Sequence, residues 1–141
     1  MKVSRRCQVA SYRLKKNLKR EMQSYKDLEI YRLAHELAVE IHEMTMSLPN
    51  FELFEEGSQI RRSSKAIVSN IVEGFGRKRY PQDYVRFLVF AHSSCDETRE
   101  HLELLYETQS ITDGEKFKRF SENYQKLSKM INKLIQAIKK T

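Results

Sequence analysis

Four segments of the chain repeat apolar side chains at the three- and four-residue intervals of an amphipathic α-helix. The first covers about residues 27–47 and ends before Pro49, because the residue that precedes a proline is disfavoured in the α region. The second covers about residues 55–73 and carries small residues that permit close helix approach. Gly74 and Gly76 follow it, and we interpret them as a C-terminal cap, since glycine tolerates the left-handed conformation there.

The third segment starts near Pro81, a residue suited to the first turn of a helix, and continues through Tyr106. Its apolar sector is wider than one bundle core needs, which indicates a second buried face and therefore self-association. One face holds Val85, Leu88, Val89, Leu102 and Leu105, with Phe87, Phe90, Ala91 and Ser94 beside it.

The fourth segment begins at Thr112 or Asp113, either of which is a suitable N-cap residue. Its stripe alternates steps of three and four residues, the heptad seam of left-handed bundle packing. The members of this stripe are Phe117, Phe120, Tyr124, Leu127, Ile131, Leu134 and Ile138. Short connections between long helices favour antiparallel neighbours. The pattern therefore predicts an all-α fold, an up-down-up-down antiparallel left-handed four-helix bundle.

The net charge of the 141-residue chain is +7, and it is unevenly placed. Residues 1–21 contain eight basic side chains and one acidic one, whereas residues 22–141 contain 18 of each sign. We therefore expect a basic N-terminal extension over residues 1–21 and a bundle domain over residues 22–141. The extension has two interpretations. In the first, it is a tail that binds phosphate backbone. In the second, it is either a flexible extension or upstream sequence that precedes a native start at Met22.

Membrane and secreted classes are excluded by what the sequence lacks. It has no run of about 18 apolar residues and no apolar secretory region, so we expect a cytoplasmic protein without a membrane span. Its two cysteines, Cys7 and Cys95, do not make a disulfide framework.

Histidine and cysteine side chains of the predicted helices do not form a site of known spacing. His35 and His42 are seven residues apart, not the four of a zinc-binding helix, and we interpret them as surface or rim residues. His92 and Cys95 would supply at most two metal ligands, so we expect Cys95 to be buried and inert. No nucleophile motif such as GxSxG occurs. A Cys–His or Ser–His nucleophile whose members are distant in the chain stays open as an alternative, and with it an enzyme whose site has no sequence motif. We expect no catalytic residue, no metal and no cofactor, and a protein that is not an enzyme.

The second segment and the turn after it carry the strongest local signal for a binding surface. One polar face, which continues into a basic turn, is made by Ser58, Arg62, Lys65, Ser69, Glu73 and Arg77-Lys78-Arg79. Two interpretations stay open: a solvated face whose cations balance the helix dipole, or a patch that contacts phosphates. Tyr80 and Tyr84 lie nearby and add rings for base stacking.

These residues also make the chain recognisable, because it resembles the four-helix-bundle family encoded in intervening sequences of bacterial 23S ribosomal RNA genes. The resemblance spans about residues 25–138. The matching pieces are Tyr31-Arg32-Leu33-Ala34-His35-Glu36-Leu37, Gln59-Ile60-Arg61-Arg62-Ser63, Ser69-Asn70-Ile71-Val72-Glu73-Gly74, Arg86-Phe87-Leu88 and Ala91-His92-Ser93-Ser94-Cys95-Asp96-Glu97. Val72 stands where the family usually has Ala, and Ser93 where it usually has Gly; both are changes in packing.

The resemblance implies a homopentamer of left-handed up-down bundles with no established enzymatic activity. One relative, an accessory protein of diversity-generating retroelements, forms a basic pentameric barrel that binds nucleic acid and a reverse transcriptase. Carried over to this chain, it nominates as nucleic-acid contacts Arg61, Arg62, Lys65, Arg77, Lys78 and Arg79. The other motif residues are expected to be structural, namely Gln59, Asn70, Glu73, Gly74, Ser94 and Glu97.

Two functions are therefore expected. In the first, a cytoplasmic homo-oligomeric bundle binds RNA or DNA through its basic patch. In the second, the oligomer has a structural or protein-interaction role and no contact with nucleic acid. The expected partners are further copies of the chain, then RNA, DNA or another protein, and no membrane.

Overall fold

The computed structural model describes residues 8–9 and 24–141. Within that part of the chain, four long helices and two short ones follow one another. They are η1 (Tyr25–Asp27), α2 (Glu29–Thr45), α3 (Asn50–Phe54), α4 (Glu56–Gly76), α5 (Pro81–Glu107) and α6 (Gly114–Lys139). The predicted all-α four-helix bundle is confirmed. The predicted basic extension lies almost entirely outside the described residues.

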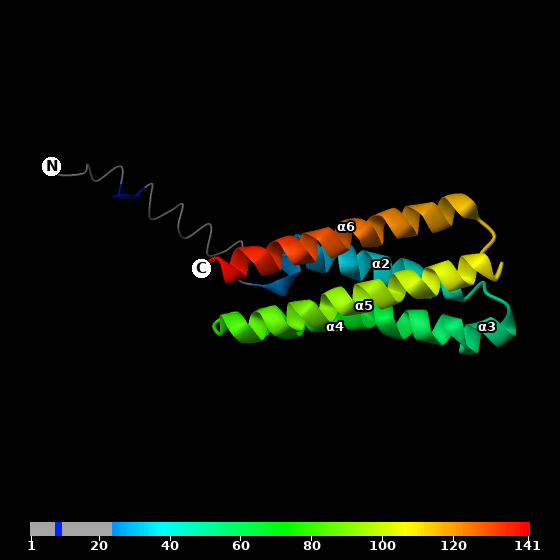
Figure 1. Ribbon diagram of the computed structural model, residues 1–141, viewed down its shortest axis with the longest axis horizontal. Helices are drawn as coiled ribbons and strands as arrows, with labels where there is room; N and C mark the ends of the chain where they lie inside the picture. Colours follow the sequence, from blue (N-terminus) through cyan, green and yellow to red (C-terminus); the bar gives the residue numbers. More distant parts are fainter. Residues whose placement is uncertain (1–7, 10–23) are drawn as a thin grey trace.

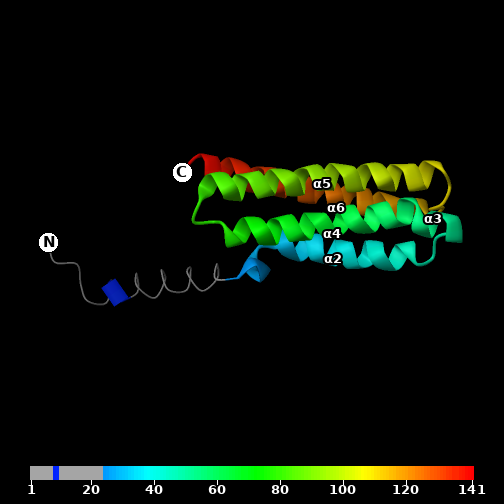
Figure 2. The same cartoon turned by 90° about the horizontal axis from the view of Figure 1, so that it is seen from below.

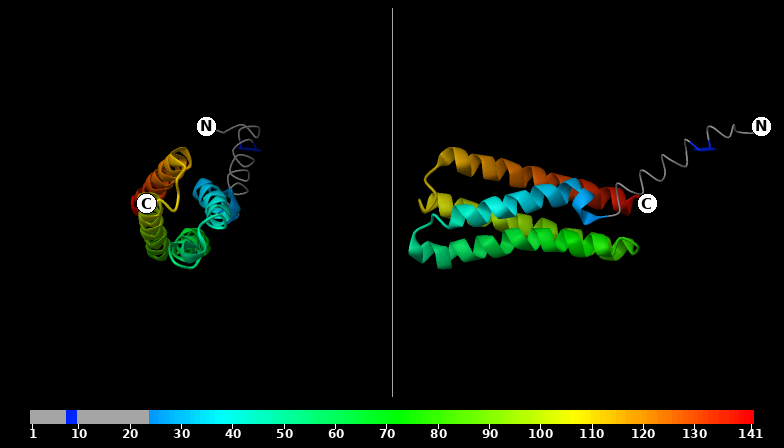
Figure 3. Two further views of the ribbon diagram at one scale, coloured as in Figure 1. Left: turned by 90° about the vertical axis from the view of Figure 1, so that its right-hand side faces the viewer. Right: turned by 180° about the vertical axis from the view of Figure 1, so that it is seen from behind.

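The four long helices stand around one core in chain order, as the end-on view shows (Figure 3). Successive long helices run in opposite directions, so the α4–α5 turn, the start of α2 and the end of α6 meet at one end (Figure 1, Figure 2). Helix α3 and the α5–α6 turn lie at the other end (Figure 1). Contacts across the bundle fix the level of each helix, because Thr98 of α5 lies beside Ser63 of α4, and Cys95 of α5 lies beside Tyr124 of α6. Arg119 of α6 in turn donates a hydrogen bond to Glu40 of α2.

The heptad seam of α6 packs into the core as the sequence predicts. Its middle is buried and its ends are partly buried, with Phe120, Tyr124, Leu127 and Ile131 in the first group and Phe117, Leu134 and Ile138 in the second. Complete burial of a large apolar side chain contributes about 1.5–3 kcal/mol to folding. The middle of α6 is therefore a main source of the stability of the bundle.

Helix α5 buries most of the predicted face, since Leu88, Leu102 and Leu105 lie in the core. Val89 and Phe90 are 44% and 47% exposed, so part of the wide apolar sector is not covered within one chain. The buried stripe also includes Tyr84, Cys95 and Thr98. Cys95 and Thr98 each have a hydrogen-bond partner on a neighbouring helix, which is what buried polar groups require.

Gly74 and Gly76 lie inside α4, so the interpretation of these glycines as a left-handed cap is wrong. No glycine in the described part of the chain has a positive φ. A Cβ on Gly74 would lie 3.2 Å from the Cβ of Phe87 and 3.4 Å from the carbonyl oxygen of Tyr84. Gly74 therefore permits the close approach of α4 to α5. The helix ends at Arg77, which has φ −106° and ψ 15°.

The other helix ends follow the predicted signals. Pro81 occupies the first turn of α5. Asp113 caps α6, since its Oδ1 accepts hydrogen bonds from the backbone N–H groups of Glu115 and Lys116 at 3.1 Å each. Helix α3 was not predicted, because five residues are too few to show a helical period. Of the helices described, none has the length and apolar character needed to cross a bilayer.

Candidate nucleic-acid interface

The six cations nominated from the sequence fall into two groups on α4. Residues 61–65 lie in the first half of this helix, whereas residues 77–79 follow its last turn. At a rise of about 1.5 Å per residue, Arg61 and Arg77 are about 24 Å apart along the helix axis. The six cations therefore do not form one patch within a single chain.

Arg61 has an internal role in the first group. Its Nη1 donates a hydrogen bond to Thr45 Oγ1 at 3.0 Å, and its Nη2 donates one to the carbonyl oxygen of Leu53 at 2.9 Å. The half-buried side chain thus joins α2, α3 and α4 at one corner. Arg62 and Lys65 are exposed instead. Contact of these three residues with nucleic acid stays a prediction.

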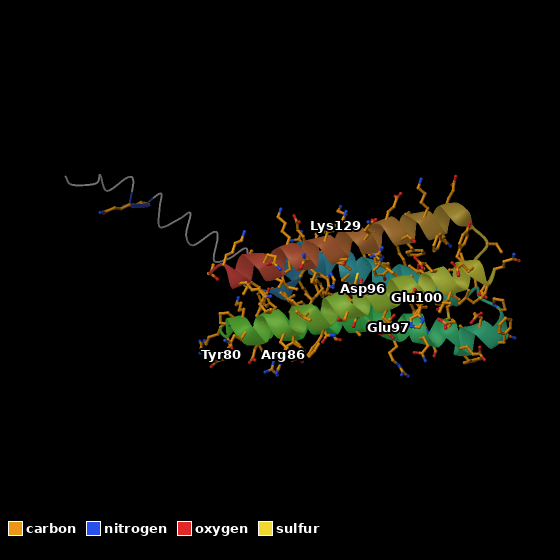
Figure 4. The ribbon with its side chains drawn as sticks, viewed as in Figure 1. Tyr80, Arg86, Asp96, Glu97, Glu100 and Lys129 are labelled. Carbon is orange, nitrogen blue, oxygen red and sulfur yellow. The ribbon has the colours of Figure 1, made fainter. Side chains whose placement is uncertain are left out.

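Exposed cations, the exposed Tyr80 and the half-buried Phe87 gather where α4 turns into α5. We define the turn cluster as Arg77, Lys78, Arg79, Tyr80, Arg86 and Phe87. The connection is tight, since the N–H of Tyr80 donates a hydrogen bond to the carbonyl oxygen of Arg77 at 2.8 Å. Tyr80 is 61% exposed at the end of the bundle, and Arg86 follows on α5 (Figure 4).

Aromatic contacts order the arginines of the turn cluster while leaving them exposed. The Cζ atoms of Arg77 and Arg86 lie 4.9 Å and 5.7 Å from the ring centroid of Phe87. Such cation–π contacts are worth about 0.5–1 kcal/mol at exposed sites. Arg77 Nε also lies 3.8 Å from Glu73 Oε2. Sequence reasoning had missed Arg86 as a site residue, because only the packing of α5 against α4 brings Arg77 to the ring of Phe87, the residue that follows Arg86.

Tyr84 does not belong to the turn cluster, and the expectation that it stacks on a base is wrong. Its side chain is 6% exposed and packs in the core, and this burial raises the pKa of its hydroxyl group. Tyr80 is left as the ring available for stacking at this turn.

The remaining family-motif residues are spread over α4 and α5. Gly74 is buried, Asn70 and Ser94 are half-buried, and Gln59, Glu73 and Glu97 are exposed. The carbonyl oxygen of Ser94 accepts a hydrogen bond from Thr98 Oγ1 at 2.8 Å. For Gly74 the close helix approach supplies a structural reason, and for the others a structural role stays a prediction.

Two hydrogen-bonded pairs of polar side chains, which sequence reasoning missed, lie at the end opposite the turn cluster. His101 Nδ1 donates a hydrogen bond to Glu56 Oε2 at 2.6 Å, and His101 Nε2 lies 3.4 Å from Glu97 Oε1. The buried Glu52 accepts hydrogen bonds from Ser110 Oγ at 2.7 Å and from the N–H of Glu56 at 3.3 Å. No sequence pattern could predict these pairs, since His101–Glu56 and Ser110–Glu52 are 45 and 58 residues apart.

In the part of the chain described, no three His, Cys, Asp or Glu side chains group as metal ligands would.

A largely apolar groove of about 450 Å³ lies between α2 and α4. We call it the α2–α4 groove; it is lined by His35, Ala38, Val39, His42, Glu43, Lys65, Val68 and Ser69. The two histidines predicted to share a rim do so here. Cys95, by contrast, lies away from solvent and donates its S–H to the carbonyl oxygen of Tyr124 at 3.3 Å, as the expectation of a buried cysteine requires.

Comparison with known proteins relates this bundle to a described family and to a solved structure. Residues 26–133 match the family described as 23S rRNA-intervening sequence protein. A similar solved structure is a protein of unknown function from the S23 ribosomal protein family of Bacteroides thetaiotaomicron VPI-5482. The two chains are 28% identical and superpose with a TM-score of 0.69 over 76% of this chain and 95% of that chain. No curated protein matches the sequence.

Proposed function

Because the chain belongs to the 23S rRNA-intervening sequence protein family, we propose that it is a cytoplasmic homo-oligomeric bundle that binds RNA or DNA and does not act by catalysis. The similar solved structure is itself described as having unknown function, so the proposal rests on the site. The observation that carries it is the turn cluster, in which exposed arginine and lysine side chains flank the exposed Tyr80 in the chain. Two of these arginines, Arg77 and Arg86, pack against the half-buried ring of Phe87.

The turn cluster suits contact with a phosphate backbone next to an unpaired base. Arginine and lysine side chains supply the phosphate contacts that dominate nucleic-acid affinity. An exposed ring such as that of Tyr80 stacks on any base, which gives about 1–3 kcal/mol per base without sequence preference. Single strands are therefore the expected ligand, whether of RNA or of DNA.

Lysines of α6 add to the positive charge on the same half of the bundle. From residue 123 to residue 141 the chain has no acidic side chain and has Lys126, Lys129, Lys133, Lys139 and Lys140. These residues lead to the end of the bundle where the α4–α5 turn lies (Figure 1). The neutral total of residues 22–141 thus conceals a local excess of cations near the site.

The test is fluorescence anisotropy with labelled single-stranded RNA, single-stranded DNA and duplex, titrated at several salt concentrations. Arg79→Ala/Arg86→Ala should weaken binding and lower the salt slope by about 0.7–0.9 for each phosphate that the variant no longer neutralises. Tyr80→Ala should weaken binding to single strands more than binding to duplex. Lys116→Ala/Lys118→Ala removes equal charge from exposed positions of α6 at the other end and is the control. Equal losses in both double variants, or no binding at low salt by the unaltered chain, would contradict the proposal.

Self-association is supported by apolar surface that one chain leaves uncovered. Val89 and Phe90 are exposed on α5, and the rings of Phe87 and Phe90 lie 5.8 Å apart in an edge-to-face pair. The α2–α4 groove offers an apolar surface on the opposite side of α4. Packing Phe90 of one copy into the α2–α4 groove of the next gives a heterologous side-by-side contact, the type that generates a ring when the rotation between copies closes. Five copies is the number that the family resemblance implies.

Light scattering at high salt tests the side-by-side contact. The unaltered chain should have the mass of about five copies, and Phe90→Ser should lower that mass. Phe51→Ser removes an exposed phenylalanine of α3 and should leave the mass unchanged. A monomer at micromolar concentration would exclude the oligomer.

A structural or protein-interaction oligomer is the second candidate function. The exposed Val89 and Phe90 and the α2–α4 groove favour it, since neither feature needs nucleic acid. It is the function left if the oligomer forms but no nucleic acid binds.

A further inference from the structure

Charge is segregated along the length of the bundle. The contacts of Thr98 with Ser63, of Cys95 with Tyr124 and of Glu40 with Arg119 mark one level across the four long helices. On the side of the α4–α5 turn, residues 24–36, 67–93 and 126–141 contain 11 basic and 5 acidic side chains, a net charge of +6. On the other side, residues 37–66 and 94–125 contain 7 basic and 13 acidic side chains, a net charge of −6. We call these the basic half and the acidic half.

The acidic half ends in exposed aromatic rings. Phe51 and Phe54 of α3 are 66% and 77% exposed, and Met46 before them is 54% exposed. Large apolar side chains that are exposed close together in one segment are typical of interaction surfaces in soluble proteins. Glu55 follows these rings in the chain and is exposed as well.

Helix α3 holds these rings firmly, although it has only five residues. Arg61 donates a hydrogen bond to the carbonyl oxygen of Leu53, and the buried Glu52 accepts one from Ser110 Oγ. One side of α3 is thereby tied to α4 and to the α5–α6 turn. Phe51 and Phe54 project from the other side, as rigid anchors of an interface do.

The basic half ends in a groove that matches an aromatic anchor. This end groove has a volume of about 440 Å³ and lies between the start of α5 and the end of α6. Its lining is mostly apolar, with Pro81, Val85 and Ile138 together with Lys139. Lys139 and Lys140 are exposed beside it.

We propose that the acidic end of one copy docks on the basic end of a second copy, with the Phe51 and Phe54 rings at the end groove and Glu55 near Lys139 and Lys140. The two surfaces are opposite in charge and complementary in shape, one projecting and one hollow. They lie at opposite ends of the same molecule, so the contact is head-to-tail and leaves a free end of each kind. Such a contact does not close and extends the assembly along the bundle axis.

This end-to-end contact is weak and depends on salt. Two phenylalanines bury about 150–250 Å² each, which together with a charged rim stays at the low end of interface sizes. The attraction between the ends is screened over about 10 Å at 0.1 M salt but over about 30 Å at 0.01 M salt. Copies therefore associate end to end at high protein concentration and low salt, and polyanions that cover the basic end compete with this contact.

Sedimentation velocity of the full chain tests the contact, at about 20 mM and about 300 mM salt, between which the Debye length falls several-fold. The head variant is Phe51→Ser/Phe54→Ser, and the tail variant is Lys139→Glu/Lys140→Glu. All four positions are exposed, so both variants should fold, which circular dichroism checks. Lys126→Glu/Lys129→Glu makes the same charge change on the exposed side of α6 and is the control for the tail variant.

At low salt the unaltered chain and the control should form species heavier than the high-salt form, in amounts that grow with concentration. Each end variant alone should keep the high-salt mass. A mixture of the head and tail variants should gain heavier species again, because each variant retains one intact end.

Three results would overturn the end-to-end contact. They are an unaltered chain that keeps its high-salt mass at low salt, a single end variant that still associates, and a mixture of the two that does not. The mass at high salt tests only the side-by-side oligomer, so failure of that proposal is seen separately.

Discussion

Cys95 shows how strongly the core of this bundle excludes charge. The pKa of its thiol is raised to about 12, mainly by burial and to a lesser extent by the neighbouring Asp96, while Arg99 acts in the opposite direction. The thiol also donates a hydrogen bond to the carbonyl oxygen of Tyr124, which favours the protonated form. The folded chain therefore keeps this proton at a pH at which the unfolded chain has released it.

The free energy of unfolding should fall as the pH rises from about 9 to about 10. In this window an unfolded thiol, with a pKa of about 8.5, loses its proton while Cys95 keeps its own, which costs about 1.4 kcal/mol of stability per pH unit. Urea unfolding at several pH values measures the slope. Cys95→Ala, which retains Cys7, should show a slope smaller by about that amount. Equal slopes in the two proteins would contradict a raised pKa of the Cys95 thiol in the folded chain.

Arg61 and Arg62 are neighbours in sequence with different environments. Hydrogen bonds from a charged donor are worth about 1.5–3 kcal/mol each. Arg61→Ala removes two of them, but the side chain is only half-buried, so the free energy of unfolding should fall by about 2–4 kcal/mol, less than their full sum. Arg62→Ala changes an exposed side chain and should alter it by less than about 0.5 kcal/mol. Urea unfolding of the two variants gives the comparison, and similar losses would show that the hydrogen bonds of Arg61 contribute little.

No pattern in the sequence separates these two arginines. Both belong to the same motif and both were nominated as phosphate contacts. What distinguishes them is the position of Thr45 and Leu53 after the chain has folded back through α3. Candidate site residues can thus be named from residue type and spacing, but not sorted into binding and structural groups.

At the scale of elements, the glycines of α4 differ in what a side chain would meet. A Cβ on Gly57 would lie 2.8 Å from the carbonyl oxygen of Glu52, a distance that backbone movement alone can relieve. A Cβ on Gly76 would meet nothing within 4 Å. The same substitution at these two positions should therefore have opposite effects.

Gly57→Ala should destabilise the protein by about 1–3 kcal/mol, because α3 must shift away from α4. Gly76→Ala should stabilise it by about 0.5–1 kcal/mol, since alanine loses less backbone entropy in a helix. Thermal or urea unfolding of the two variants measures both changes. A stabilised Gly57→Ala variant would show that α3 moves away from α4 at little cost in free energy.

Apolar periodicity predicted the four long helices with ends in error by only a few residues, because each buries one continuous stripe. It failed where a short contact decides the structure. Gly74 was interpreted as a cap because its closeness to Phe87 is not visible in the local sequence. The exposure of Val89 and Phe90 depends on which neighbours α5 acquires, which periodicity does not state.

At the scale of the whole molecule, the net charge of the bundle domain conceals how its charges are placed. Residues 22–141 have equal numbers of acidic and basic side chains, so they look neutral. Folding brings the ends of three distant segments together, and the excess of each sign then collects on its own half. The lysines of α6 after residue 123 and the five acidic side chains of α5 between Asp96 and Glu107 can be seen in the sequence. Their separation in space cannot.

The segregation of charge has a practical consequence at the bench. A chain with a net charge of +7 is expected to pass through an anion-exchange column at neutral pH. Because its acidic half carries −6, this protein should instead be retained on such a resin at low salt, as well as on a cation exchanger. Glu103→Gln/Glu107→Gln, at exposed positions of the acidic half, should elute earlier from the anion exchanger and at an unchanged or later position from the cation exchanger. If the unaltered chain passed through the anion exchanger, its net charge alone would determine binding to the resin. If it is retained on both resins, anion exchange followed by cation exchange is a purification route for this protein.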